Sequence, residues 1–249
     1  MTDIRNFEED DYKNENKRQI LKVARSVPKF FRSYHAARFT GTLVDAAIKD
    51  NQQQRFDCSK GCSWCCSIPP DITAGEAFVL AKAVRDMPSE KRDETIARFR
   101  ENVARMADTS PNEQYQSQIP CGFLDLDQRA CSVYESRPAT CRRWHSLDAE
   151  KCRLAVDDPD ISVPLDPKPM SAASLVMDAY LIAMKEPVGE LQQGVLMAIE
   201  PDSEKRFARG EPIFEGWTML RDRMTPEDIE EARRIAEEMH HGTAMNSIG

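Results

Sequence analysis

The spacing of apolar residues along the chain predicts a largely helical protein. Apolar side chains recur at helical intervals over residues 17–50, where Pro28 and Gly41 are expected to divide the pattern into two or three helices. Residues 1–14 are polar and acidic and are expected to form a solvated tail. Further helices are expected over residues 89–107, 171–185 and 188–199, and from Pro226 onwards.

Local signals mark where some of the shorter elements start. Thr73 and Glu76 have the spacing of a capping box, so a helix is expected to begin after Thr73. Farther along, the sequence CGFLDLDQRACSVYE has apolar residues on both sides of a polar turn at residues 127–129, which predicts a β-hairpin. A short helix is expected to follow Pro138. We therefore expect a mainly α fold with a small β-hairpin.

Composition and charge narrow the classes of function. The chain has 249 residues, of which 41% are hydrophobic and 31% are charged, as in soluble globular proteins. Its net charge of -8 argues against broad electrostatic binding to nucleic acid or to an anionic membrane surface. The acidic start lacks the pattern of a secretory signal, and no long apolar run is present. We expect a cytoplasmic protein, in which cysteines bind metal or do redox chemistry more often than they form disulfides.

All of the cysteines lie within less than half of the chain. Four of them are crowded into the sequence DCSKGCSWCCSIPP, and the others follow at wider intervals. The full set is Cys58, Cys62, Cys65, Cys66, Cys121, Cys131, Cys141 and Cys152.

Several chemical roles are open to these cysteines. The first three lie at helical spacing and could pack as small apolar residues, but Gly61 and the Pro69-Pro70 pair interrupt a long buried helix. A reducing compartment disfavours disulfides, and no lone CxxC in a thioredoxin-like setting indicates redox thiols. Metal binding is favoured, because thiolates are strong ligands for zinc and hold iron–sulfur clusters.

The adjacent pair Cys65 and Cys66 constrains how metal could be held. Neighbouring side chains point in different directions in either regular structure, so the pair serves two centres, or one thiol is a ligand and the other supports it. The thiols could form two four-sulfur zinc sites, two clusters, or one four-sulfur site with four thiols left over. His145 follows Cys141 by four residues and is a candidate extra ligand if the short helix persists.

The ordered cysteines and their neighbours are similar to a known family. The sequence C-SKG-C-SW-CC, followed by PCGFL and then C-SVYESRPAT-CR, resembles the zinc- or iron-chelating cysteine-cluster family that is named for its CxxxCxxCC motif and is often called YkgJ-like. The resemblance covers about a third of the chain and leaves Cys152 outside, so that residue is the less secure ligand. Gly122 stands where the family usually has proline, which should alter loop stiffness rather than ligation.

The resemblance implies metal chelation and leaves the metal open: zinc, or iron, including iron in an iron–sulfur cluster. Tyr134, Arg137 and Arg142 belong to the matching residues, and cations beside a thiolate centre would stabilise its negative charge. The resemblance brings no settled reaction, so whether the protein is an enzyme is undetermined. The metal ion is the partner expected, and no protein partner is indicated.

An iron–sulfur enzyme is the main alternative. Related motifs occur in flagellin lysine methylases, and Cys58, Cys62 and Cys65, with Trp64 before the third, have the spacing by which radical S-adenosylmethionine enzymes hold a cluster with one open iron. The rest of the chain lacks the repeating strand–helix units of their barrel. No glycine-rich phosphate loop, G-x-S-x-G or H-E-x-x-H motif is present. A plain helical interaction protein with incidental cysteines is the third interpretation.

Three regions are expected along the chain. Residues 1–57 would form the tail and a helical scaffold, and residues 58–155 the cysteine-cluster metal-binding domain, an irregular core surrounded by helices. Residues 156–249 begin with a connector rich in proline and aspartate and would form a C-terminal helical region packed on the same globule.

Overall fold

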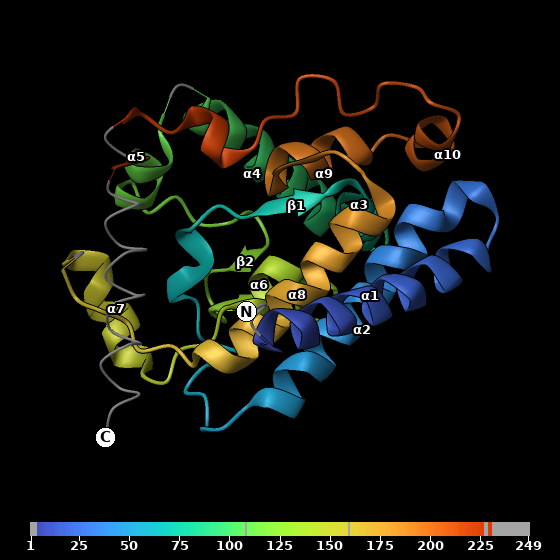
Figure 1. Ribbon diagram of the computed structural model, residues 1–249. Helices are drawn as coiled ribbons and strands as arrows, with labels where there is room; N and C mark the ends of the chain where they lie inside the picture. The colour runs from blue at the N-terminus through green and yellow to red at the C-terminus, as the bar shows by residue number, and fades with distance from the viewer. Residues whose placement is uncertain (1–3, 108, 159, 227–228, 231–249) are drawn as a thin grey trace.

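The computed structural model describes residues 4–107, 109–158, 160–226 and 229–230. It confirms a mainly α fold, in which the strands form two small antiparallel pairs. Figure 1 shows long helices around the outside and shorter elements between them. Within the described residues, no helix is long and apolar enough to cross a membrane.

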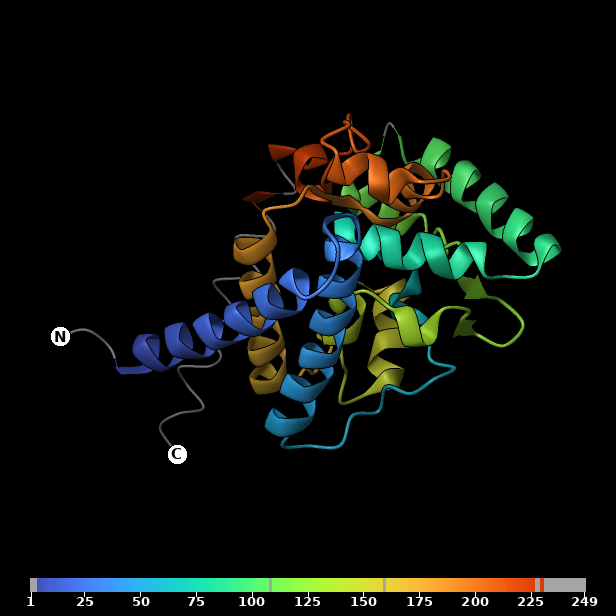
Figure 2. The same cartoon turned by 90° about the vertical axis from the view of Figure 1, so that its right-hand side faces the viewer.

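Three long helices pack together on one side of the molecule: α1 (Ile4–Arg25), α2 (Arg32–Asn51) and α8 (Pro167–Met184). Figure 2 shows α2 and α8 side by side, with α1 crossing them. Small side chains at the contacts allow the helices to approach closely. Their shared buried core contains Ile20, Ala24, Ala36, Ala37, Ala179 and Tyr180.

The N-terminal region differs from the sequence expectation in two ways. α1 begins at Ile4, so most of the expected tail is helical, although residues 9–11 are exposed as expected. Packing of α1 on α8 and α2 supplies the stabilisation that this polar sequence lacks by itself. The predicted break at Pro28 is confirmed by the 3-10 turn η1 (Lys29–Phe31), but α2 runs through Gly41 without interruption, because its buried face is continuous.

A second group of helices packs on the other side: α3 (Ala74–Arg85), α4 (Ser89–Met106), α9 (Leu191–Ala198) and α10 (Ser203–Ala208). The predicted capping box of α3 is confirmed, since Glu76 N donates to Thr73 Oγ1 (3.3 Å) and Thr73 N donates to Glu76 Oε2 (2.9 Å). The core of this group includes Phe78, Leu80, Phe99, Phe123, Leu191 and Phe214.

A strand pair that the sequence did not indicate lies at the start of α3 and α9. β1 (Asp71–Thr73) pairs antiparallel with β4 (Val188–Glu190), with Ile72 opposite Gly189. The segment expected to be helical from residue 188 therefore starts as a strand, and α9 begins only at Leu191. Strands of three residues are too short to show an alternating pattern in the sequence.

The cysteine-rich part of the chain is built from short elements. The predicted hairpin is present as β2 (Leu124–Asp125) and β3 (Ala130–Cys131), and the predicted short helix is α6 (Ala139–Arg143). The other short elements are η2 (Trp64–Ser67), η3 (Tyr134–Ser136) and α7 (Ala149–Asp157). α7 lies on the side of the molecule opposite α1 (Figure 1).

Two more short elements lie in the rest of the described chain. The segment between α4 and the hairpin contains α5 (Pro111–Gln116), which starts at a proline as helices often do. The described chain also forms a short 3-10 turn, η4 (Leu220–Arg223). The helix expected from Pro226 lies mainly outside the described residues.

Candidate metal centre

A tight loop gathers the first four cysteines. Gly61 has a φ of 102°, a left-handed conformation that favours glycine. Cys62 N donates to the Ser59 carbonyl (3.0 Å), and Cys66 N donates to the Ser63 carbonyl (2.9 Å) as the chain enters η2. These two turns reverse the chain twice within a few residues, which is why the thiols come close together without a regular helix.

Contacts with the hairpin hold this loop from outside. The Arg129 guanidinium carbon lies 4.1 Å from the centre of the Trp64 ring, and Arg129 Nε donates to Ser63 Oγ (3.2 Å). Cys121 N, at the start of the hairpin segment, donates to the Cys66 carbonyl (2.7 Å). The loop and the hairpin are thus joined at the residues that carry thiols.

The hairpin presents two thiols in matching local surroundings. Cys121 precedes β2, and Cys131 ends β3. Each thiol accepts a hydrogen bond from the backbone N–H two residues later, Phe123 for Cys121 and Val133 for Cys131. N–H donors aimed at sulfur stabilise the thiolate form that a metal requires.

Helix α6 carries Cys141. Its first turn is fixed to the start of α3, because Ala139 N donates to Glu76 Oε1 (2.7 Å). Thr140 Oγ1 also donates to the Asp71 carbonyl on β1 (3.0 Å). Glu76 therefore caps α3 with one carboxylate oxygen and holds α6 with the other.

Ser146 joins Cys58 to Cys152. Ser146 N donates to Cys58 Sγ (3.1 Å), and the Ser146 hydroxyl is hydrogen-bonded to the Cys152 thiol. Cys152 is carried by α7, which is capped by Asp148 and packs against η2. The cysteine that lies outside the family motif is therefore placed beside the first cysteine of that motif.

All eight cysteines are free thiols, and their surroundings affect their acidity differently. Burial raises the pKa of Cys121 to about 12 and raises the pKa of Cys141 well above its ordinary value. A hydrogen bond from the Cys66 thiol lowers the pKa of Cys65 to about 7, and the same bond raises the pKa of Cys66. A nearby cation would offset the cost of ionising the buried thiols.

The thiols do not surround a single point at which a metal ion could be bound. No three His, Cys, Asp or Glu side chains in the described residues form a ready coordination sphere. The donor set nevertheless fits zinc or iron, since both prefer thiolate ligands and several of these thiols already accept N–H bonds. Closing a centre would therefore need side-chain movement, within a backbone that already brings the donors together.

The arginines near the cysteines have separate roles. Burial raises the pKa of Cys131 and Cys141, and the charge of Arg137 opposes that rise; the Arg137 guanidinium carbon lies 3.6 Å from the centre of the Tyr134 ring. Arg142 instead stabilises the backbone at Arg137, because Arg142 Nε donates to the Arg137 carbonyl (2.7 Å). The positive charge expected beside the thiols is thus supplied by Arg137, held in place by the other two residues.

The position of His145 is fixed by contacts with residues other than the cysteines. α6 ends at Arg143, and the chain is extended at Trp144, so the helical face carrying Cys141 does not continue to His145. The His145 ring stacks on Phe56 with centroids 4.4 Å apart, and its Nδ1 lies 3.2 Å from the Arg143 carbonyl oxygen. Burial lowers the pKa of His145.

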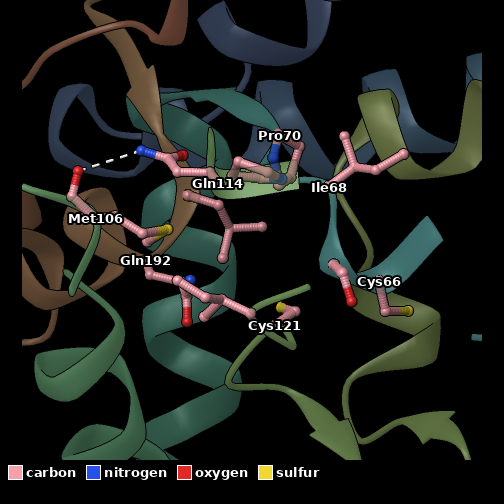
Figure 3. A pocket seen from close by; sticks show the side chains of 11 residues that line it. Cys66, Ile68, Pro70, Met106, Gln114, Cys121 and Gln192 are labelled. Carbon is pink, nitrogen blue, oxygen red and sulfur yellow. Dashed lines mark hydrogen bonds between the residues drawn. The ribbon is translucent and has the colours of Figure 1, made fainter. Parts of the chain in front are cut away.

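A small cavity of about 10 Å³ lies beside Cys66 and Cys121. Figure 3 shows these two residues on one side of it and Gln114 with Met106 on the other. Gln114 Nε2 donates to the Met106 carbonyl (3.2 Å), while Gln114 Oε1 is buried without a hydrogen-bond partner. The volume suits a single water molecule, which could satisfy this oxygen, and is too small for an organic ligand.

The structure gives a reason for glycine at position 122 that the sequence alone did not indicate. A Cβ atom on Gly122 would lie 2.2 Å from Phe99 Cδ1, inside the van der Waals contact distance. Gly122 N also donates to Gln192 Oε1 (3.0 Å), which accepts a second bond from Asn102 Nδ2 (2.8 Å). Proline at this position would lack that N–H and would clash with Phe99. The residue that departs from the family pattern is therefore matched to α4 and α9.

Comparison with known proteins agrees with the resemblance drawn from the sequence. Residues 57–157 match the model of the CxxCxxCC family, described as a "Putative zinc- or iron-chelating domain". The matched range includes Cys152 as well as the motif cysteines. No curated protein and no solved structure matches the chain.

Proposed function

We propose that residues 57–157, the part of the chain that matches the CxxCxxCC family, bind zinc or iron through cysteine thiolates. The observation that carries the proposal is that all eight cysteines are free thiols, carried by a loop, a hairpin and two short helices within the matched residues. Backbone N–H groups directed at Cys58, Cys121 and Cys131 support it, since metal-bound thiolates use such donors.

The bound metal would act as a cross-link in the least regular part of the fold. The hairpin strands are two residues long, and α6 has five residues, so these elements have little stability of their own. Thiolate ligation would tie them to η2 and α7. The three cores are formed mainly by the long helices, and the cysteine-rich segments contribute only Phe123, Val133 and Ala139 to their described buried residues. We therefore propose that metal orders the cysteine-rich segments rather than the whole molecule.

A reducing compartment such as the cytoplasm suits this chemistry. The cysteines are exposed or half-buried, and none is paired in a disulfide. An exposed thiol such as Cys65 would be oxidised in a secretory compartment before metal could protect it. We therefore propose a cytoplasmic location, which fractionation of cells producing the protein would test.

The proposal is tested by metal and acid-labile sulfide analysis of protein purified without oxygen. Zinc without sulfide, in a colourless protein, would identify a zinc centre. Iron with stoichiometric sulfide and a broad visible absorption band would identify an iron–sulfur cluster and would favour the enzyme alternative. Protein that carries neither metal, takes up neither when supplied, and folds normally in chelator would overturn the proposal.

Serine variants connect the metal to the assigned ligands. Cys62→Ser and Cys121→Ser should each lower the metal content, because each removes a thiolate from a different segment. Ser132→Ala is a matched control beside Cys131, since the Ser132 hydroxyl is buried without a hydrogen-bond partner and its removal should leave the metal content unchanged. Unchanged metal in both cysteine variants would refute the ligand assignment.

A further inference from the structure

We infer that the protein binds a small organic cation, an amine with a compact apolar body, in a cavity enclosed by α2, α3, α6, α8 and the strand pair β1–β4. The cavity is distinct from the cysteine cluster, since none of the described residues that line it is a cysteine. The inference therefore goes beyond metal binding and does not depend on it. It rests on the size of the cavity, its apolar walls, and an acidic residue that has no paired cation.

The size of the cavity limits what it can hold. Its volume is about 140 Å³. Helices α2 and α8, which run side by side in Figure 2, form one part of its wall, and β1, α3 and α6 contribute the rest with β4. A cavity of about 150 Å³ in another protein holds one benzene molecule, so there is room here for a ring or chain of about six carbon atoms. Pockets for larger organic ligands start at about 300 Å³.

Most of the wall is apolar, and the cavity opens toward α8. Ala37, Ile72 and Ala139 line the cavity and are themselves buried. Leu181 also lines it but is 39% exposed, which marks the side facing the solvent. Half-buried Met177 lies one helical turn away on the same helix. The cavity would therefore enclose an apolar ligand body and admit it past flexible side chains.

The hydroxyl groups of the wall have no proton to offer a ligand, because each already donates to a protein acceptor. These bonds run from Thr40 to the Ala36 carbonyl (2.9 Å), from Thr140 to the Asp71 carbonyl (3.0 Å), from Thr73 to Glu76 Oε2 (3.1 Å) and from Tyr180 to Glu186 Oε2 (2.7 Å). The lining therefore presents oxygen acceptors rather than donors. A ligand that hydrogen-bonds to it must bring its own donors, as an ammonium group does.

Glu76 supplies the negative charge for such a group. Its carboxylate accepts from Ala139 N (2.7 Å), from Thr73 N (2.9 Å) and from the Thr73 hydroxyl. A carboxylate has about four acceptor positions, so one is left. The described residues that line the cavity include no lysine, arginine or histidine. Arg142, whose charge reaches Glu76, is itself ion-paired with Asp45.

The surroundings of Glu76 add to the preference for a cation. Asp71 also lines the cavity, and Glu186 lies behind the Tyr180 hydroxyl. Burial raises the pKa of Glu76 and of Glu186, and the charge of Glu76 raises the pKa of Glu186 further. A bound ammonium group would offset this repulsion and the cost of burying the carboxylates. A carboxylate ligand would instead be repelled by Glu76 and Asp71.

Benzylamine, benzyl alcohol and benzoate test the inference, because they share one ring and differ in charge. NMR of the full-length protein labelled with ¹³C at its methionine methyl groups would follow Met177, assigned through Met177→Leu. Near neutral pH, benzylamine should shift this signal saturably. Benzyl alcohol should bind about tenfold more weakly, since it lacks a charge-assisted hydrogen bond, and benzoate should leave the signal unshifted. Met170, on the same helix but outside the described lining, should not respond.

Two variants, each with a matched control, connect binding to this cavity. Glu76→Gln should weaken benzylamine binding about tenfold and affect benzyl alcohol less, whereas Glu90→Gln, in the exposed first turn of α4, should change neither. Thr40→Leu should abolish binding of both molecules by filling the cavity. Thr42→Leu should not, because Thr42 is exposed on the same helix, where its hydroxyl likewise donates to a carbonyl of α2 (2.7 Å).

The ligand series on wild type keeps the inference testable even where a variant fails to fold, which circular dichroism would show. No saturable shift of the Met177 signal by benzylamine, or binding of benzyl alcohol or benzoate as tight as that of benzylamine, would overturn the inference. Equal benzylamine affinity in wild type and folded Glu76→Gln would also overturn it. Metal content, measured in the same samples, should be equal in wild type and Thr40→Leu, so failure of this inference would leave metal binding standing.

Discussion

At the scale of single residues, Cys65 differs from the other cysteines. It is exposed, and the hydrogen bond from Cys66 lowers its pKa to about 7. Because the thiolate is the nucleophile, Cys65 should be the first thiol that iodoacetamide alkylates in metal-free protein. Its alkylation rate should rise with pH and reach half of its maximum near pH 7, as the thiolate fraction grows through the pKa.

Mass spectrometry after brief labelling at several pH values measures this order. Cys66→Ala is the informative variant, since it removes the hydrogen-bond donor and should return the pKa of Cys65 toward its ordinary, higher value, slowing its labelling at neutral pH. Earlier labelling of Cys121 or Cys141, whose pKa values are raised by burial, would contradict this account.

Gly122→Ala should destabilise the protein by about 1–3 kcal/mol, the usual cost of forcing an extra atom into a packed core. The added Cβ would meet the Phe99 ring, which is fully buried and packs edge-to-face on Phe123 with centroids 4.8 Å apart. Chemical denaturation of both proteins, saturated with the same metal, measures the change in free energy of unfolding.

Gly41→Ala provides the matched control for this substitution. Gly41 lies inside α2, and the atom nearest to an added Cβ, Arg142 Nε, is 3.5 Å away, an ordinary contact. Alanine should therefore stabilise α2 by about 0.5–1 kcal/mol. Equal effects of the two substitutions would show that close packing at Gly122 is not the cause.

The sequence identified the cysteines but not the residues that position them. Cysteine is rare enough, and its spacing distinctive enough, for a ligand hypothesis to be made directly. Ser146 and Gln192 have no such signal, because serine and glutamine are common and their partners, Cys58 and Gly122, are far away in the sequence. Glycine at position 122, in place of the proline usual in the family, was the one visible sign of that packing.

At the scale of elements, the start of α3 binds two carboxylates of the chain itself. Glu76 accepts from Thr73 N and from Ala139 N, while Glu186 accepts from Gly75 N (3.0 Å) and from the Tyr180 hydroxyl (2.7 Å). A helix N-terminus favours negative charge, but burial outweighs it here and raises the pKa of both carboxyl groups. The network joins α3 to α6 and α8, so its charge state affects how these helices are held.

Glu186→Gln should change the pH dependence of stability in a defined direction. Since the folded pKa of Glu186 is raised, its stabilising contribution is full below its unfolded pKa and is lost as the pH rises through the folded value. Glutamine keeps a hydrogen-bond acceptor and does not titrate. The free energy of unfolding of the variant should therefore increase relative to wild type between pH 4 and pH 8, by denaturation at each pH; a constant or falling difference would contradict the assignment.

Elements with a local signal were predictable, and those formed by distant partners were not. The capping box at Thr73 is encoded within four residues, and the hairpin by apolar residues flanking a polar turn. β1 and β4 each span three residues and exist because Ile72 and Gly189 are brought together by packing of α3 and α9. The polar N-terminal part of α1 is likewise helical in its tertiary context rather than by its own pattern.

At the scale of the whole molecule, the cysteine-rich segments are supported by helices from both ends of the sequence. α6 packs against α2 and α8, while the hairpin residue Phe123 belongs to the core that contains α3 and α9. Composition and periodicity predicted the helical class, but they cannot encode which helices pair, because that depends on contacts between residues far apart in the chain.

X-ray absorption spectroscopy of the bound metal tests the central claim, thiolate ligation, most directly. The account predicts a first shell made of sulfur alone, at about 2.3 Å for zinc, with four sulfur atoms per metal. The same spectrum should change in Cys141→Ser, where oxygen could replace one sulfur, and should not change in Ser132→Ala. A first shell dominated by nitrogen or oxygen in the wild-type protein would contradict the account.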